Sequence, residues 1–162
     1  MNARKKTTRS AGPDAITLLK ADHAEVKKMF KEFDQLHKKG ADEKAQKVAL
    51  TICKELTAHT KIEEEIFYPA VRAVIKDDDL LDEATIEHAS AKDLIAQIKR
   101  MKPSEAMYAA RVTVLGEYIN HHVKEEHEEM FPKARKTKID MKELGSRMAA
   151  RKKELLSDSA AG

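Results

Sequence analysis

Histidine and glutamate recur at one spacing in two segments of the chain. His59 is followed four residues later by Glu63, and His122 is followed four residues later by Glu126. Residues four positions apart lie on one face of a helix, so each pair can direct both side chains toward one centre. Imidazole nitrogens and carboxylate oxygens are metal ligands, and a buried carboxylate is costly unless it is paired or binds a cation. The spacing therefore indicates a metal site.

The alternative explanation is a charged, solvated helix face, because the segment "HHVKEEHEEMFP" (His121–Pro132) is rich in histidine and glutamate. The helical phase separates the two explanations. Apolar residues at positions 115, 119 and 130 place His122 and Glu126 on the buried stripe and the other charged residues on flanking or outer faces. Three residues off the stripe are candidates for further contacts with the site: Tyr118, His121 and His127.

Two more histidines lie on apolar stripes. His23 lies between Leu19 and Val26, and His88 recurs with apolar residues at the same helical spacing. A single core histidine is usually a hydrogen-bonded structural residue, but no Arg or Lys on these stripes can pair with so many polar groups. Without a cation, burial is expected to raise the pKa of the two carboxylates. The predicted metal ligands are His23, His59, Glu63, His88, His122 and Glu126.

The chain contains an internal repeat. A shift of 63 residues places "HTKIEEEIFYPAVR" (His59–Arg72) on "HVKEEHEEMFPKAR" (His122–Arg135), with Tyr68 over Phe131. His23 and His88 are 65 residues apart, close to the same shift. A two-helix unit used twice predicts pseudo-twofold symmetry and a dinuclear site between the halves.

The donor set favours iron. Nitrogen and oxygen ligands without thiolate fit iron, manganese or zinc better than copper(I), and a tetrahedral zinc site does not need six side chains. If two octahedral ions share the site, four imidazoles, two bridging carboxylates and a bridging oxygen leave two positions for a small ligand.

The apolar periodicity predicts four long helices, over about residues 13–36, 42–75, 80–101 and 104–136, with Pro103 opening the last. Pro69 and Pro132 should kink or end the second and fourth helices. A short fifth helix follows Asp140. The expected fold is all-α, an up-down-up-down four-helix bundle with a short C-terminal helix. The expected divisions are a disordered basic tail (1–12), the bundle (13–136), and a C-terminal helix and tail (137–162).

Composition excludes several classes of protein. Of the 162 residues, 41% are hydrophobic and 36% are charged, which is typical of a soluble helical protein. The net charge of +3 is too small to indicate nucleic-acid binding. The single cysteine, Cys53, permits no disulfide within the chain and is expected to be a small buried side chain. No membrane span, phosphate loop or nucleophile paired with a base is evident, so we expect a cytoplasmic protein that is neither a hydrolase nor a transferase.

The order His, His-x-x-x-Glu, His, His-x-x-x-Glu, with a proline ten residues after the second and fourth histidines, resembles the haemerythrin-like (HHE cation-binding) domain over about residues 14–136. The resemblance implies a non-haem di-iron centre with an oxo or hydroxo bridge. It implies that His23 and His59 bind one iron and that His88 and His122 bind the other. Glu63 and Glu126 would bridge the two ions. The oxygen carriers of invertebrates use a fifth histidine, which this chain replaces by Ala84 or Lys92.

The resemblance implies binding of, or reaction with, O2, NO, peroxide or azide-like anions, in sensing, scavenging or a redox stress response. Weak peroxidase or catalase-like activity is included in this hypothesis, and the absence of the fifth histidine disfavours reversible oxygen storage. Two other hypotheses remain: iron storage, delivery or repair of iron centres, and a helical interaction module with structural histidines. We expect a monomer or weak dimer without nucleic-acid or membrane partners.

Overall fold

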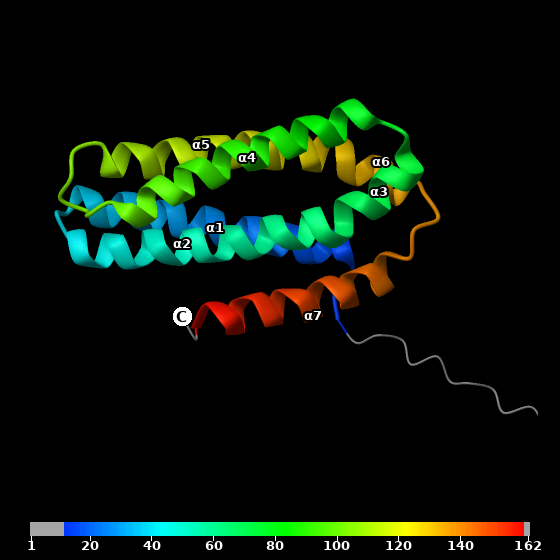
Figure 1. The fold of residues 1–162 in the computed structure, drawn as a ribbon, viewed down its shortest axis with the longest axis horizontal. Helices are drawn as coiled ribbons and strands as arrows, with labels where there is room; N and C mark the ends of the chain where they lie inside the picture. The colour runs from blue at the N-terminus through cyan, green and yellow to red at the C-terminus, as the bar shows by residue number, and fades with distance from the viewer. Residues whose placement is uncertain (1–11, 161–162) are drawn as a thin grey trace, which may run out of the picture.

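The computed structural model of the chain describes residues 12–160, and these residues form helices and turns without any strand. The all-α prediction is confirmed, whereas the predicted basic tail, apart from Gly12, lies outside the described residues. Four of the helices lie lengthwise against one another (Figure 1). Their bounds are α1 (Ala15–Lys38), α2 (Asp42–Ile62), α4 (Asp78–Arg100) and α5 (Tyr108–Glu125).

Two of these helices continue through a wider π-helical turn into a short α-helix. The π-helix η1 (Glu63–Phe67) joins α2 to α3 (Tyr68–Ile75), and η2 (Glu126–Met130) joins α5 to α6 (Phe131–Arg135). Each proline lies in the first turn of the short helix, where its missing N–H costs little. Pro69 and Pro132 thus follow a widened turn, and the helical path continues past each of them instead of ending there.

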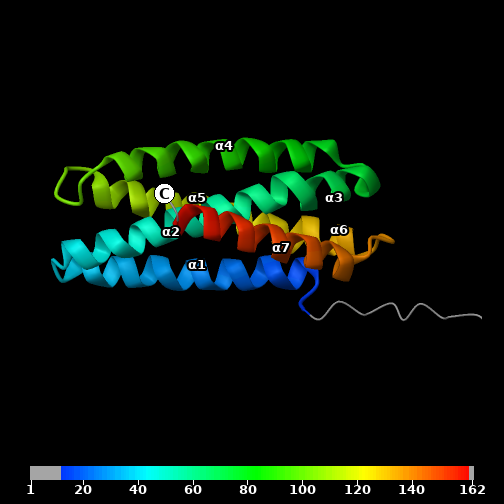
Figure 2. The same ribbon diagram turned by 60° about the horizontal axis from the view of Figure 1, so that its bottom comes forward.

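The last helix, α7 (Met141–Ala160), packs along the α1–α2 side of the bundle. Figure 2 shows it running across these two helices. The helix expected after Asp140 is therefore present, but its 20 residues make it nearly as long as α2, not short. Its amphipathic face is covered, since Leu144 and Met148 are buried in the core.

Side-chain caps explain where α1 and α4 begin. The Asp14 carboxylate accepts a hydrogen bond of 2.8 Å from the Thr17 N–H at the start of α1, and Asp77 caps α4 in the same way. The predicted start of the fourth long helix at residue 104 is wrong, because α5 begins at Tyr108. Residues 102–107 form turns, and Met107 has a left-handed backbone with φ of 73° that a helix cannot contain.

Two hydrophobic clusters fill the bundle on either side of a polar layer. One cluster includes Leu19, Phe67 and Phe131, and the other includes Ile52 and Leu115. Along each long helix or its π-helical continuation, the buried histidine lies between residues of the two clusters. Packing on both sides therefore fixes the height of each histidine in the bundle. Within residues 12–160, no helix is long and apolar enough to cross a membrane.

Candidate metal centre

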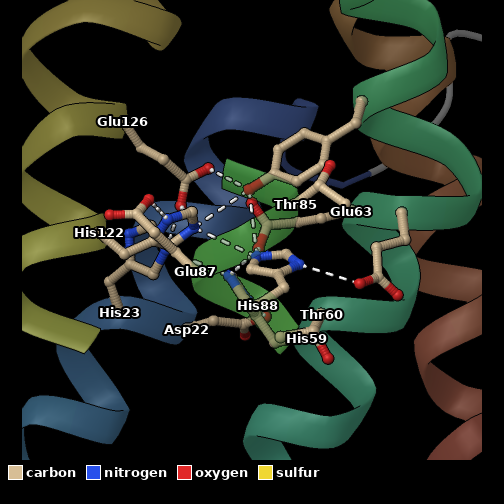
Figure 3. Close-up of polar contacts among 12 residues, drawn as sticks. Asp22, His23, His59, Thr60, Glu63, Thr85, Glu87, His88, His122 and Glu126 are labelled. Carbon is tan, nitrogen blue, oxygen red and sulfur yellow. Dashed lines mark hydrogen bonds and ion pairs between the residues drawn. The ribbon is translucent and has the colours of Figure 1, made fainter. Parts of the chain in front are cut away.

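The structure brings all six predicted side chains together in the polar layer (Figure 3). Each is at most 8% exposed, although all six are polar or ionisable. The groups fall into two sets, and within each set the ligand atoms lie within 4.8 Å of one another. The first set is His23, His59 and Glu126, and the second is Glu63, His88 and His122.

The histidines form two close pairs. The Nε2 atoms of His23 and His59 are 3.2 Å apart, and those of His88 and His122 are also 3.2 Å apart. Two imidazoles bound at right angles to one ion, each at about 2.1 Å, would place their nitrogens about 3 Å apart. The observed spacing in each pair therefore fits two ligands on one metal ion.

Each glutamate lies between the two pairs. The Glu63 Oε1 atom is 2.9 Å from His59 Nε2 and 3.4 Å from His88 Nε2. The Glu126 Oε1 atom is 3.0 Å from His122 Nε2 and 3.5 Å from His23 Nε2. Each carboxylate therefore contacts one imidazole of the first pair and one of the second. A bridging ligand requires such a placement.

The outer nitrogen of every histidine has its own partner. His59 Nδ1 lies 2.9 Å from Asp22, His88 Nδ1 lies 3.2 Å from Glu64, and His122 Nδ1 lies 2.8 Å from Glu87. His23 Nδ1 lies 2.9 Å from His127 Nε2. A carboxylate only accepts hydrogen bonds, so Nδ1 of His59, His88 and His122 must donate. In the neutral imidazole, Nε2 then presents a lone pair to the centre.

The centre consequently contains many hydrogen-bond acceptors and few donors. Within the described residues, both carboxylate oxygens of Glu63 and the Oε1 atom of Glu126 are buried without a hydrogen-bond donor. Four Nε2 atoms face the same space. Buried acceptors without donors are costly, and cations relieve that cost directly. The donor set and its unsatisfied oxygens thus fit two metal ions that prefer nitrogen and oxygen ligands.

Protons are the other source of positive charge. Although burial alone would lower it, the carboxylates of Glu63 and Asp22 raise the pKa of His59 to about 10. The pKa of His122 is also well above its ordinary range, because Glu126 and Glu87 outweigh the effect of burial. Burial would raise the pKa of Glu63, but His59 holds it well below the ordinary range. The expectation of a raised carboxylate pKa is therefore wrong for Glu63, because neighbouring imidazoles outweigh burial. Metal binding must displace these protons.

The internal repeat extends to the outer partners. Asp22 and Glu87 each precede the first histidine of their unit, and both contact the histidine of the His-x-x-x-Glu motif. Glu64 and His127 each follow the motif glutamate, and both contact the first histidine of the opposite unit. The halves therefore share one plan, with a carboxylate in one half where the other has an imidazole.

Sequence reasoning missed Tyr68, which contacts the centre. Its hydroxyl is 3.2 Å from His88 Nε2, 3.1 Å from His122 Nε2 and 3.5 Å from Glu126 Oε2. Burial raises the pKa of the phenol well above its ordinary value, and Glu126 and Glu63 raise it further, so the hydroxyl stays protonated. The available signal was its alignment with Phe131 in the repeat, which marks it as a difference between the halves.

The other candidates lie farther from the centre. Among the six predicted ligands, His127 contacts His23, at its outer nitrogen. The His121 side chain is 67% exposed and pairs with Glu125 and Glu87. Tyr118 is about half exposed and lines a small cavity beside the centre. Lys92, at a position of the missing fifth histidine, binds the Glu64 carboxylate at 2.6 Å.

A cavity of about 20 Å³ adjoins the histidines, and both polar and apolar side chains line it. Its apolar lining includes Val26, Leu56, Ala91, Ile119 and Val123. This volume suffices for about one water-sized molecule. The space is too small for an organic substrate. Cys53 is buried outside this lining, within the second hydrophobic cluster, and burial raises its pKa to about 11.

Comparisons with known proteins agree with this geometry. The sequence profile of the Hemerythrin HHE cation binding domain matches residues 14–134. A DNA nickase of Nostoc sp. is 33% identical over 114 residues, which are 70% of this chain and 31% of that protein. This chain thus spans less than a third of that relative. The crystal structure of a Hemerythrin HHE cation binding domain-containing protein from Mycobacterium kansasii superposes with a TM-score of 0.76. The match covers 93% of this chain and 91% of that chain at 24% identity, which shows a shared fold.

Proposed function

The chain belongs to the Hemerythrin HHE cation-binding domain family, and on this basis we propose that it is a non-haem di-iron protein that binds or reacts with O2, NO or peroxide. The family assignment establishes cation binding. The observation that carries the finer proposal is the position of Glu63 and Glu126, each between imidazoles of both pairs and without sufficient donors. One cation would leave one histidine pair without a partner.

We further infer that residues 13–136 form an up-down-up-down four-helix bundle and that residues 137–160 form an extension that packs on it. Three features support this inference: the four long helices, their short connections, and the alternating direction in which they run in Figure 1. Such a bundle allows each helix to contribute its own histidine at one height.

His23 and His59 would hold one iron, and His88 and His122 the other, with Glu63 and Glu126 shared between them. Iron bound there would supply redox chemistry toward oxygen, nitric oxide or peroxide. The protein contributes three things to that chemistry. Asp22, Glu64 and Glu87 orient the imidazoles, the small cavity excludes large solutes, and the Tyr68 hydroxyl holds a proton beside His88 and His122.

Small-molecule reaction or sensing fits this chain better than reversible oxygen storage. The two positions one turn from His88 are alanine and lysine, so neither supplies a third imidazole. Ala84 packs in a hydrophobic cluster and Lys92 is paired with Glu64. With two imidazoles each, both irons would have room for an external ligand. A cytoplasmic location and a monomeric or weakly dimeric state remain predictions. The nickase activity of the relative forms no part of the proposal, because 31% of that protein is matched.

Metal analysis of purified protein tests the proposal. Protein expressed with both iron and zinc should contain close to two irons and little zinc, and its visible absorption should change with azide. His59→Ala and His122→Ala should each lose metal, since both remove an inward nitrogen. His121→Ala is the matched control, because that neighbouring imidazole is exposed. One zinc without iron, or equal metal loss in all three variants, would contradict the proposal.

A further inference from the structure

The C-terminal helix α7 lies beyond residues 14–134, the part that matches the family profile, yet it is closely packed on the bundle. Leu144 is 3% exposed and Met148 is 0% exposed. At Gly145, a Cβ atom would lie 2.5 Å from the Pro13 carbonyl oxygen and 2.7 Å from the Ala15 nitrogen. Only glycine permits this contact between the helix and the start of α1, so α7 has a defined docked position.

A chain of polar contacts runs from this helix to the centre. The Lys152 Nζ atom lies 2.5 Å from Asp22 Oδ1, and the other oxygen of that carboxylate lies 2.9 Å from His59 Nδ1. The Asp22 side chain is 12% exposed and that of Lys152 is 23% exposed. Glu55 lies farther from the ammonium group, at 3.8 Å. Lys152 therefore fixes one oxygen of Asp22 while the other orients His59.

The other three histidines of the centre are held from within the bundle. His88 is held through Glu64, which binds Lys92 on α4, and His122 is held through Glu87, beside His121 on α5. His23 contacts His127 on η2. Among these four histidines, the described contacts connect only His59 to a helix outside the family-matched residues.

We propose that Lys152 is a positioning residue for His59, acting through Asp22, and that docking of α7 sets how firmly metal is held at the His23–His59 position. The proposal rests on the proposed di-iron function. An ammonium group on Oδ1 keeps the carboxylate from turning toward solvent and keeps Oδ2 on the imidazole. Loss of a group that is hydrogen-bonded to a metal ligand, as Asp22 is to His59, typically changes metal affinity about 10- to 100-fold. Lys152 is one contact farther from the metal, so its loss should change the affinity about three- to tenfold.

Release of iron to a chelator tests the proposal. Full-length protein loaded anaerobically with ferrous iron is mixed with a chromogenic chelator, and the rate and amplitude of each release phase are measured. Lys152→Met should accelerate release of about one of the two irons three- to tenfold, and Lys152→Arg should restore slow release. Lys92→Met, which frees Glu64 in the other half, should accelerate the other iron instead.

Arg151→Met is the matched control on the same helix. Arg151 binds Glu65 and Glu154 and contacts neither Asp22 nor a histidine in the contacts described. It should lower stability as much as Lys152→Met while leaving both release phases unchanged. Gly145→Ala displaces α7 by a different route and should accelerate the same phase as Lys152→Met.

Equal release rates in wild type and Lys152→Met, or equal acceleration by Lys152→Met and Arg151→Met, would overturn the proposal and leave the di-iron function intact. A wild-type protein that holds no iron would overturn the proposed function and this inference together.

Discussion

Each histidine of the centre uses its two ring nitrogens for different purposes. Nε2 faces the space between the helices, while Nδ1 contacts a partner that fixes the rotation of the ring. This division requires eight or more polar groups in fixed positions, and the two hydrophobic clusters on either side supply the rigidity. Single side chains therefore account both for the groups that face the centre and for the contacts that hold the imidazole rings in place.

Tyr68 offers a test at this scale. Tyr68→Phe removes a protonated hydroxyl that lies 3.1 Å from His122 Nε2, while the ring remains in place. Iron content should stay the same, but azide should bind about tenfold more weakly, because a bound anion loses a hydrogen-bond donor. Azide titration followed by visible absorption measures the change.

Tyr118→Phe is the control for this change, since that ring is about half exposed and only borders the cavity. Equal azide affinity in Tyr68→Phe and wild-type protein would show that the hydroxyl does not meet the ligand.

The helical elements explain what the sequence could and could not predict. The three-four spacing of apolar residues correctly placed His59 and Glu63 inward, because His59 precedes the π-helical turn and Glu63 is its first residue, so both still follow ordinary helical phase. Tyr68 lies beyond that turn, five residues after Glu63, where its N–H bonds to the Glu63 carbonyl. One additional residue in the turn restores it to the inward face. Ordinary periodicity contains no sign of such an insertion.

The start of α5 was missed for a related reason. "PSE" (103–105) has the composition of a helix start, but Met107 adopts a left-handed backbone that interrupts it. A methionine side chain does not predict that conformation, which is set by the turn that connects α4 to α5.

Met107→Gly tests the cost of this turn. Met107 has φ of 73° and is 65% exposed, so glycine should relieve backbone strain with little loss of packing. The free energy of unfolding should rise by roughly 0.5–1 kcal/mol. Chemical denaturation of the metal-loaded protein measures it. Ser104→Gly, in the same connection but without a positive φ, should give no gain, and a gain there as large as at Met107 would refute the explanation.

At the scale of the whole molecule, the buried ionisable groups of the centre make the free energy of unfolding depend on pH. Metal-free protein must satisfy the buried carboxylates with protonated imidazoles. The pKa of His59 is about 10 in the folded chain and 6.5 ordinarily, so its contribution to stability is complete below pH 6.5. It is lost as the pH rises from 6.5 to about 10. Glu63, with a lowered pKa, contributes above pH 4.5 and loses its contribution as the pH falls below that value.

Metal-free protein should therefore be most stable between about pH 4.5 and 6.5 and should weaken steadily toward pH 10. Urea denaturation of the chelated protein across this range measures the profile. His59→Gln should flatten the alkaline decline, whereas His37→Gln, at an exposed position, should leave it unchanged. A free energy of unfolding that increases between pH 6.5 and 10 would contradict the assignment.

The repeated plan of the two halves has a consequence for how far they can differ. If one half were a separate polypeptide and paired with its own copy, strict twofold symmetry would give both metal positions the same surroundings. Joining the halves in one chain removes that constraint. Glu64 can then stand opposite His127 in the plan, and Tyr68 opposite Phe131. In the proposed di-iron protein, covalent fusion would thus leave one position free to retain its ion while the other exchanges ligands or metal.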